Sequence, residues 1–254
     1  MGKIYSIVFS PTGGTKKAAD MIAETAGMHV EEIDLTDRTV DFSKYSFEQD
    51  DVCFVSVPSY GGRVPNLAVT RLQQMKGNGA AAVLVVVYGN RHYDDTFAEL
   101  QDALEEAGFY PMAAVAALAE HSIVRSLASG RPDEADKEQL KEFADKIWAK
   151  VKGGSRAEKL QLPGNRPYKE FGGGMKPMAT DSCVQCGTCA KACPAEAIPA
   201  DAPNTTNAEK CISCMRCISV CPMEARMLNE QMFAGITERL TTACAQRREN
   251  ELFL

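Results

Sequence analysis

The sequence has no hydrophobic run long enough to cross a membrane. Its longest uncharged apolar runs, 80–88 and 112–119, are far shorter than the ~20 residues that a membrane helix needs. It also lacks an excess of basic charge, because 28 Lys and Arg side chains stand against 34 Asp and Glu, a net charge of -6. We therefore expect no membrane span, and no binding of nucleic acid or of anionic lipid surfaces.

Several sequence signals are also missing. Only a short apolar stretch, 4–9, separates Lys3 from a Ser-Pro-Thr-Gly-Gly loop, so there is no signal-peptide core and we expect a cytoplasmic protein. Neither GxxxxGK[ST] nor GxGxxG occurs, which argues against a P-loop nucleotide site and a dinucleotide site. The 254 residues, 45% of them hydrophobic, are enough for one large domain or two unequal ones.

Cysteine, by contrast, is abundant and clustered, with eight of the ten residues between 183 and 221. The spacing C-x2-C-x2-C-x3-C-P occurs twice, starting at Cys183 and at Cys211. In bacterial ferredoxins three thiolates of such a run bind one [4Fe-4S] cluster and the fourth binds the other. We therefore predict two clusters, one bound by Cys183, Cys186, Cys189 and Cys221, the other by Cys211, Cys214, Cys217 and Cys193.

Cysteine can also have other uses. Zinc knuckles also use CxxC pairs, but zinc needs four ligands per site and has no use for a third CxxC thiol and a Cys-Pro repeated twice. Cys53 lies in an apolar run and is interpreted as a core thiol, while Cys244 lies outside both repeats.

The first two thirds of the chain alternate apolar, often β-branched runs with helical patterns. The runs at 3–9, 29–35, 51–57, 80–88 and 109–118 indicate strands, and 15–26, 65–76, 94–107 and 133–151 indicate helices. Such alternation predicts an α/β fold with a doubly wound, parallel five-stranded sheet. Ligands of these sheets bind outside the carboxyl ends of the strands, at the topological switch point.

Three loops at those strand ends carry the site residues. The first, at 10–16, reads Ser-Pro-Thr-Gly-Gly-Thr-Lys and opens a helix, so hydroxyls, backbone N–H groups and the helix dipole can bind a phosphate. The loops at 58–65 and 88–95 each place a tyrosine near glycine. A mononucleotide phosphate fits this arrangement best.

These loops resemble those of the flavodoxin family. The family's Ser/Thr-x-Thr-Gly-x-Thr loop matches residues 10–15, and its Gly-x-x-x-Tyr loop matches 89–93. The resemblance implies FMN, with the phosphate held by Ser10, Thr12, Gly13, Gly14, Thr15 and the amide of Lys16. It implies a ring site between Ser59, Tyr60 and Gly61 on one side and Gly89, Asn90, Arg91 and Tyr93 on the other, with Tyr93 stacking. The third-strand loop lacks the Trp or acidic cluster of many flavodoxins, which leaves the inner stacking partner open.

Over nearly its whole length the chain resembles the flavodoxin-ferredoxin fusion proteins called EFR-family ferrodoxins. We expect a flavodoxin-like FMN domain at 1–152, a Gly/Pro-rich linker at 153–179 and a small α+β bacterial-type ferredoxin domain at 180–229. A helical tail, 230–254, follows. The tail packs on a domain or on a second subunit of a homodimer, with a frayed terminus as the alternative. For the linker, tethered motion and a fixed path are both open.

Two functions follow. The leading one is an electron-transfer flavo-iron-sulfur protein that links FMN to two [4Fe-4S] clusters, and so couples one- and two-electron carriers among redox partner proteins in anaerobic metabolism. The alternative is a ferredoxin-driven FMN reductase of a small substrate such as a quinone, a corrinoid or a flavin.

His121 follows the fifth strand, at the end of the sheet where the flavin loops lie, and is a candidate proton donor. The alternative role for this side chain is hydrogen bonding near the surface.

Overall fold

The computed structural model describes residues 2–154, 156 and 159–254. Its central sheet contains β1 (Ile4–Val8), β2 (Val30–Asp34), β3 (Val52–Pro58), β4 (Ala81–Tyr88) and β5 (Tyr110–Leu118). These five strands are parallel and lie in the order β2-β1-β3-β4-β5. This is the flavodoxin-like doubly wound order, whose switch point lies between β1 and β3. The predicted fold class is confirmed.

Helices cover both faces of this sheet because successive side chains of a strand point to opposite sides. Val52 and Phe54 of β3 pack in the layer of α1 (Gly14–Ala23) and α4 (Glu134–Gly153). Cys53 and Val55 pack in the opposite layer, with α2 (Asn66–Leu72) and α3 (Thr96–Glu106). Two short 3-10 turns, η1 (Glu24–Ala26) and η2 (Phe42–Lys44), lie in the connections.

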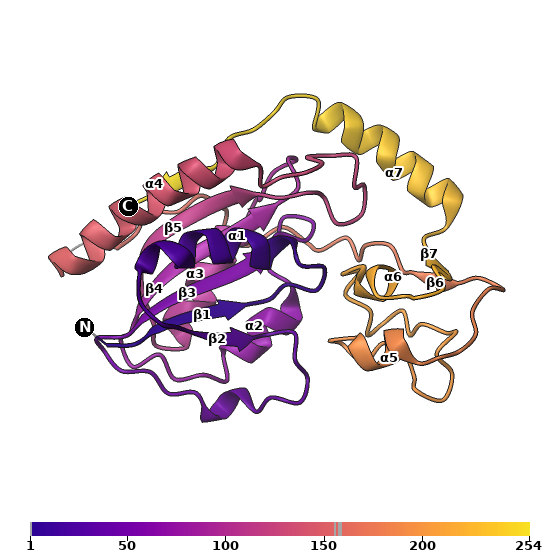
Figure 1. Cartoon of the computed structure of the whole chain (residues 1–254), viewed down its shortest axis with the longest axis horizontal. Coiled ribbons are helices and arrows are strands. Elements are labelled where there is room, and N and C mark those ends of the chain that lie inside the picture. Colours follow the sequence, from indigo (N-terminus) through magenta and orange to yellow (C-terminus); the bar gives the residue numbers. More distant parts are fainter. Residues whose placement is uncertain (1, 155, 157–158) are drawn as a thin grey trace.

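A sixth strand, absent from the prediction, completes the sheet. The tail begins as helix α7 (Glu230–Ala243), but it ends as strand β8 (Glu251–Phe253), which pairs antiparallel with β5. Asn250, directly before β8, holds the start of this strand in place. Its side chain accepts a hydrogen bond from the Leu118 N–H at 2.8 Å and donates one to Asp136 at 3.0 Å. In Figure 1 the yellow α7 crosses from the small domain back to this edge of the sheet.

The small domain is built around the two cysteine repeats. It contains α5 (Thr188–Ala192), α6 (Arg216–Ser219) and a two-stranded antiparallel sheet of β6 (Met178–Ala179) and β7 (Arg226–Met227). Matching positions of the two repeats have the same left-handed backbone: Gln185 with Ser213, Gly187 with Met215, and Glu196 with Glu224. The repeats therefore fold alike, even where Met215 adopts a conformation that favours glycine.

The connection between the domains runs along a fixed path on α3. The buried carboxylate of Asp95 accepts from the backbone N–H groups of Asn165 at 2.8 Å and Lys169 at 2.7 Å. About two helical turns further on, Asp102 accepts from Arg166 and Tyr168. Of the two behaviours open for the linker, the structure has the fixed path.

The domains also touch each other directly. Arg71 of α2 is buried and donates to the carbonyl oxygens of Leu35, after β2, and of Pro194, which follows Cys193. Arg216 of α6 donates to the Thr36 hydroxyl at 2.9 Å. The cysteine repeats therefore face the carboxyl ends of the strands, where the predicted flavin loops lie. In the described ranges, none of the helices has the length and apolar character to span a bilayer.

We expect Asp95→Ala to release the linker from α3, because three N–H donors lose their acceptor. Limited proteolysis should cut within 160–176 several times faster than in the parent chain, while the far-UV circular dichroism stays the same. Glu138→Ala removes an exposed carboxylate of α4 and is the matched control. An unchanged cleavage rate for Asp95→Ala would show that the linker is held by other contacts.

Candidate functional site

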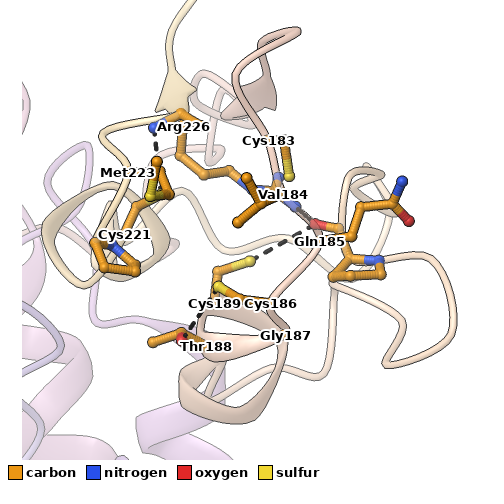
Figure 2. A pocket seen from close by; sticks show the side chains of 13 residues that line it. Cys183, Val184, Gln185, Cys186, Gly187, Thr188, Cys189, Cys221, Met223 and Arg226 are labelled. Atoms are coloured by element: carbon orange, nitrogen blue, oxygen red, sulfur yellow. Dashed lines mark hydrogen bonds between the residues drawn. The ribbon is translucent and has the colours of Figure 1, made fainter.

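The eight clustered cysteines gather around two pockets of the small domain. Cys183, Cys186, Cys189 and Cys221 line the first, shown in Figure 2 and here called the distal pocket. Cys193, Cys211, Cys214 and Cys217 line the second, called the proximal pocket because it faces the large domain. In each pocket three cysteines of one repeat meet the fourth cysteine of the other, the same grouping that the sequence spacing predicts.

The local geometry suits sulfur that accepts hydrogen bonds. The N–H of Ala197 donates to Cys193 Sγ at 3.3 Å, and the N–H of Ala225 donates to Cys221 Sγ at the same distance. Both donors lie four residues after the crossing cysteine, in the turn that follows each Cys-Pro. Among the described residues no three His, Cys, Asp or Glu side chains gather closely enough to hold one metal ion. A [4Fe-4S] cluster does not need several side chains close to one metal ion, because each of its four thiolates binds a different iron.

The two pockets differ in exposure. Cys193, Cys214 and Cys217 of the proximal pocket are buried, and burial raises the pKa of Cys214 to about 11 and that of Cys217 to about 12. At neutral pH these thiols therefore stay protonated unless a cation binds the sulfur. In the distal pocket Cys186 is exposed, and Val184 and Met223 beside it are 62% and 50% exposed.

A cleft of about 620 Å³ opens at the carboxyl ends of the strands. The large domain contributes the loops after β3, β4 and β5, and the linker contributes residues 169–172 and 174. The small domain contributes Ile212 and Ser213, which stand between Cys211 and Cys214, and α7 closes the remaining side with Ile236, Arg239, Leu240 and Ala243. The volume lies in the range of small-molecule and cofactor sites.

The predicted ring residues divide into two groups. Those that line the cleft are Ser59, Tyr60, Gly61, Gly89 and Arg91, together with His121. Asn90 and Tyr93 are absent from its lining. The Asn90 amide donates to the carbonyls of Cys244 and Gln246, and Tyr93 is buried, with its hydroxyl donating to Glu251 of β8. The expected stacking role of Tyr93 is therefore not supported, because the returning tail binds this tyrosine.

The predicted phosphate loop opens α1 at the same end of the sheet, outside the lining of the cleft. Gly13 caps the helix with φ of 90°, a conformation suited to glycine, and Thr12 is exposed beside it. The Lys16 amide donates to Ser10 Oγ at 2.9 Å, and its ammonium pairs with Asp20 and Glu32. The amide and the ammonium of Lys16 therefore bind groups of the protein itself. Thr12 and Gly13 are the residues of this loop that are exposed to solvent.

Phe171 is a cleft residue that sequence reasoning did not place there. It comes from the linker, is 45% exposed, and its ring would lie 3.3 Å from a Cβ on Gly61. This ring lies against Gly61 and lines the cleft beside Tyr60. Its only signal in the sequence is an aromatic residue in a glycine-rich stretch.

His121 is held as a neutral ring. Its Nδ1 accepts from the backbone N–H groups of Ile123 at 3.2 Å and Val124 at 3.1 Å, so the neutral ring carries its proton on Nε2. Burial, with a smaller effect of the Arg91 charge, lowers the pKa of His121 to about 4. The ring packs against Gly89, where a Cβ would lie 2.6 Å from it. At neutral pH His121 can donate a hydrogen bond but carries no charge.

Parts of the chain are similar to known proteins. Residues 177–245 match the family model of a 4Fe-4S dicluster domain. A flavodoxin of Streptococcus pneumonia TIGR4 is 24% identical over 58% of this chain and 99% of its own, with a TM-score of 0.41. Flavodoxin 1 of Bacillus cereus is 17% identical over 61% of this chain and 99% of its own, with a TM-score of 0.40. No curated protein matches the chain significantly.

We expect His121→Asn to reduce the loss of stability in acid. Because folding lowers the pKa of His121 from about 6.5 to about 4, the unfolded chain binds the proton more tightly, and stability present above pH 6.5 is lost as the pH falls toward 4. Asparagine keeps a side-chain acceptor for the two N–H groups but does not titrate. The guanidinium midpoint should therefore fall less between pH 7 and pH 4.5 in the variant. Parallel pH profiles would contradict this assignment.

Proposed function

We propose that this chain is an electron-transfer flavo-iron-sulfur protein that carries electrons between FMN in the cleft and two [4Fe-4S] clusters in the cysteine pockets. One observation carries the proposal: Ile212 and Ser213, which lie between two cysteines of the proximal pocket, form a wall of the cleft. FMN takes up two electrons together or one at a time, whereas each cluster carries one. The short path between these sites supports direct exchange.

Tyr60 supports the same path. Tyr60 lines the cleft. Burial raises the pKa of its hydroxyl well above the usual value, and the nearby Cys214 makes a smaller contribution in the same direction. The tyrosine therefore stays protonated beside the proximal cysteines. Ile212 packs against the core of the large domain. These two partly buried side chains lie between the cleft and the proximal pocket.

The exposure of the cysteines supports an order of sites. The proximal pocket is enclosed between the domains, whereas the distal pocket reaches solvent at Cys186, Val184 and Met223. We propose that one-electron partner proteins exchange electrons through the distal side. In the large domain, Thr12 and Gly13 would bind the FMN phosphate and the Tyr60–Gly61 loop with Phe171 would contact its ring.

The reductase alternative has its own support in the polar groups of the cleft. Arg91, His121 and Arg239 line it from two loops and from α7. A small electron-accepting substrate could be bound by these donors. Stopped-flow oxidation of the reduced protein separates the two functions, since rapid turnover with one small molecule but not with carrier proteins would favour the reductase.

We expect protein purified without oxygen to contain about eight irons and one FMN per chain, as two clusters and one flavin site require. Cys221→Ser should damage the distal cluster and Cys193→Ser the proximal one, because each removes the ligand that crosses from the other repeat. Iron and sulfide assays with EPR spectra of the reduced protein measure both losses, and FMN should remain in each variant. Two zinc ions in place of iron would refute the proposal.

Gly13→Val should abolish FMN binding and leave both clusters intact, because a β-branched residue is strained at φ of 90° and its side chain fills the space beside the phosphate loop. Flavin release and iron content give the readout. Gly153→Val, at an exposed glycine with open space around it at the end of α4, is a control remote from the cleft. A flavin-free Gly13→Val protein that still exchanges electrons with a ferredoxin-type donor and acceptor at the parent rate would remove FMN from the path.

A further inference from the structure

Each cysteine pocket is lined by one arginine with an unused hydrogen-bond donor. Arg226 lines the distal pocket and Arg216 lines the proximal pocket. In both side chains the Nε atom is buried and has no hydrogen-bond partner among the described residues. Figure 2 shows the Arg226 side chain extending from its strand across the pocket that the distal cysteines line.

Both guanidinium groups donate hydrogen bonds elsewhere through their terminal nitrogens. Arg226 donates through Nη1 to the Thr206 hydroxyl at 2.6 Å and through Nη2 to the carbonyls of Pro203 and Thr205. Arg216 donates through Nη1 to Thr36 across the domain contact. Three hydrogen bonds thus hold the Arg226 guanidinium and one holds that of Arg216, and the Nε of each is left to its pocket. A buried donor without an acceptor loses its hydrogen bond to water and gains none in return, so such donors normally have a partner.

We propose that the Nε–H of Arg226 donates a hydrogen bond to a sulfur of the distal cluster, and that the Nε–H of Arg216 does the same for the proximal cluster. This assignment rests on the proposed function, since it needs a [4Fe-4S] cluster in each pocket. Reduction adds negative charge to a cluster, and hydrogen bonds to its sulfurs stabilise that charge. Each arginine therefore raises the reduction potential of its own cluster.

The sequence repeat alone does not predict that each pocket has one arginine. Both arginines belong to the second repeat, and the matching positions of the first repeat hold Thr188 and Ile198. Arg216 stands among its own repeat's cysteines, whereas Arg226 follows Cys221, the cysteine that crosses to the distal pocket. Because the ligands cross, one repeat supplies a cationic donor to each pocket.

Lysine is the substitution that isolates the donor. It retains a positive charge and places a methylene group where arginine has Nε–H. This matters for Arg226, whose charge also acts on Cys217 of the proximal pocket, so that a neutral residue would affect both clusters.

The test is an anaerobic redox titration of the full chain, monitored by EPR, for the parent, Arg226→Lys and Arg216→Lys. We expect each variant to keep both clusters and to make the reduction of one of them about tenfold less favourable, which is a fall of about 59 mV for one electron. The two variants should move different clusters and leave the FMN couples unchanged. Unchanged potentials in both variants would overturn the proposal.

Matched controls separate the Nε–H from the anchoring of the guanidinium. Thr206→Val and Thr36→Val each remove a partner of Nη1 and leave Nε in place, so neither should shift a cluster potential by a comparable amount. An equal shift in the controls would assign the effect to loop position and overturn the role of Nε.

A measurement on the unmutated chain keeps the proposal testable if a lysine variant fails to assemble a cluster. Protein labelled with 15N only at arginine Nε should show nitrogen hyperfine coupling in pulsed EPR spectra of the reduced clusters. Absence of that coupling in iron-replete protein would overturn the proposal. Absence of iron would instead defeat the proposed function itself, so the two failures are distinguishable.

Discussion

The buried guanidinium of Arg71 joins the two halves of the molecule, and the geometry of the cleft depends on it. No carboxylate in the described part of the chain forms an ion pair with this side chain, so two backbone carbonyls, Leu35 O and Pro194 O, replace the water that it loses. The ring of Phe42 lies 5.5 Å below the charge. Moving a cation from water into the protein interior costs several kcal/mol unless its N–H donors find hydrogen-bond acceptors there. The cysteine repeat and the strand ends are therefore most stable when they meet at this arginine, which fixes Ile212 and Ser213 as a wall of the cleft.

Local pattern was sufficient to predict the features that depend on short stretches of chain. The apolar run of β3 (Val52–Pro58) predicts a strand, and the cysteine spacings predict which cysteines line each pocket, because both depend on neighbours in the sequence. Features that depend on distant partners were missed. Tyr93 matched a flavin-loop pattern, but it is buried by contacts with β8, more than 150 residues further along the chain. Phe171 reaches the cleft because Asp95 and Asp102 hold the linker on α3. Neither contact leaves a periodic signal in the sequence.

The two pockets also show how one repeated motif can serve two environments. The same left-handed positions recur in both repeats, so the backbone around each set of cysteines is alike. Their surroundings differ: one set lies against the large domain, while the other has Cys186 open to solvent. Because burial, charge and hydrogen bonds set the potential of an iron-sulfur site, equal ligands in these unequal surroundings need not have equal potentials. The crossing of the fourth cysteine keeps both sites in one small domain despite this difference.

The return of the tail to β5 changes what kind of unit the small domain is. The chain leaves the sheet through the linker on α3 and comes back through α7 to pair as β8. The cysteine domain is thus an insertion held at two points, not an appendage at one end. Two tethers keep its effective concentration at the cleft high even when the surface contacts open, because the loss of either attachment alone leaves the other in place. A single proteolytic cut would nick this protein without dividing it into its two domains.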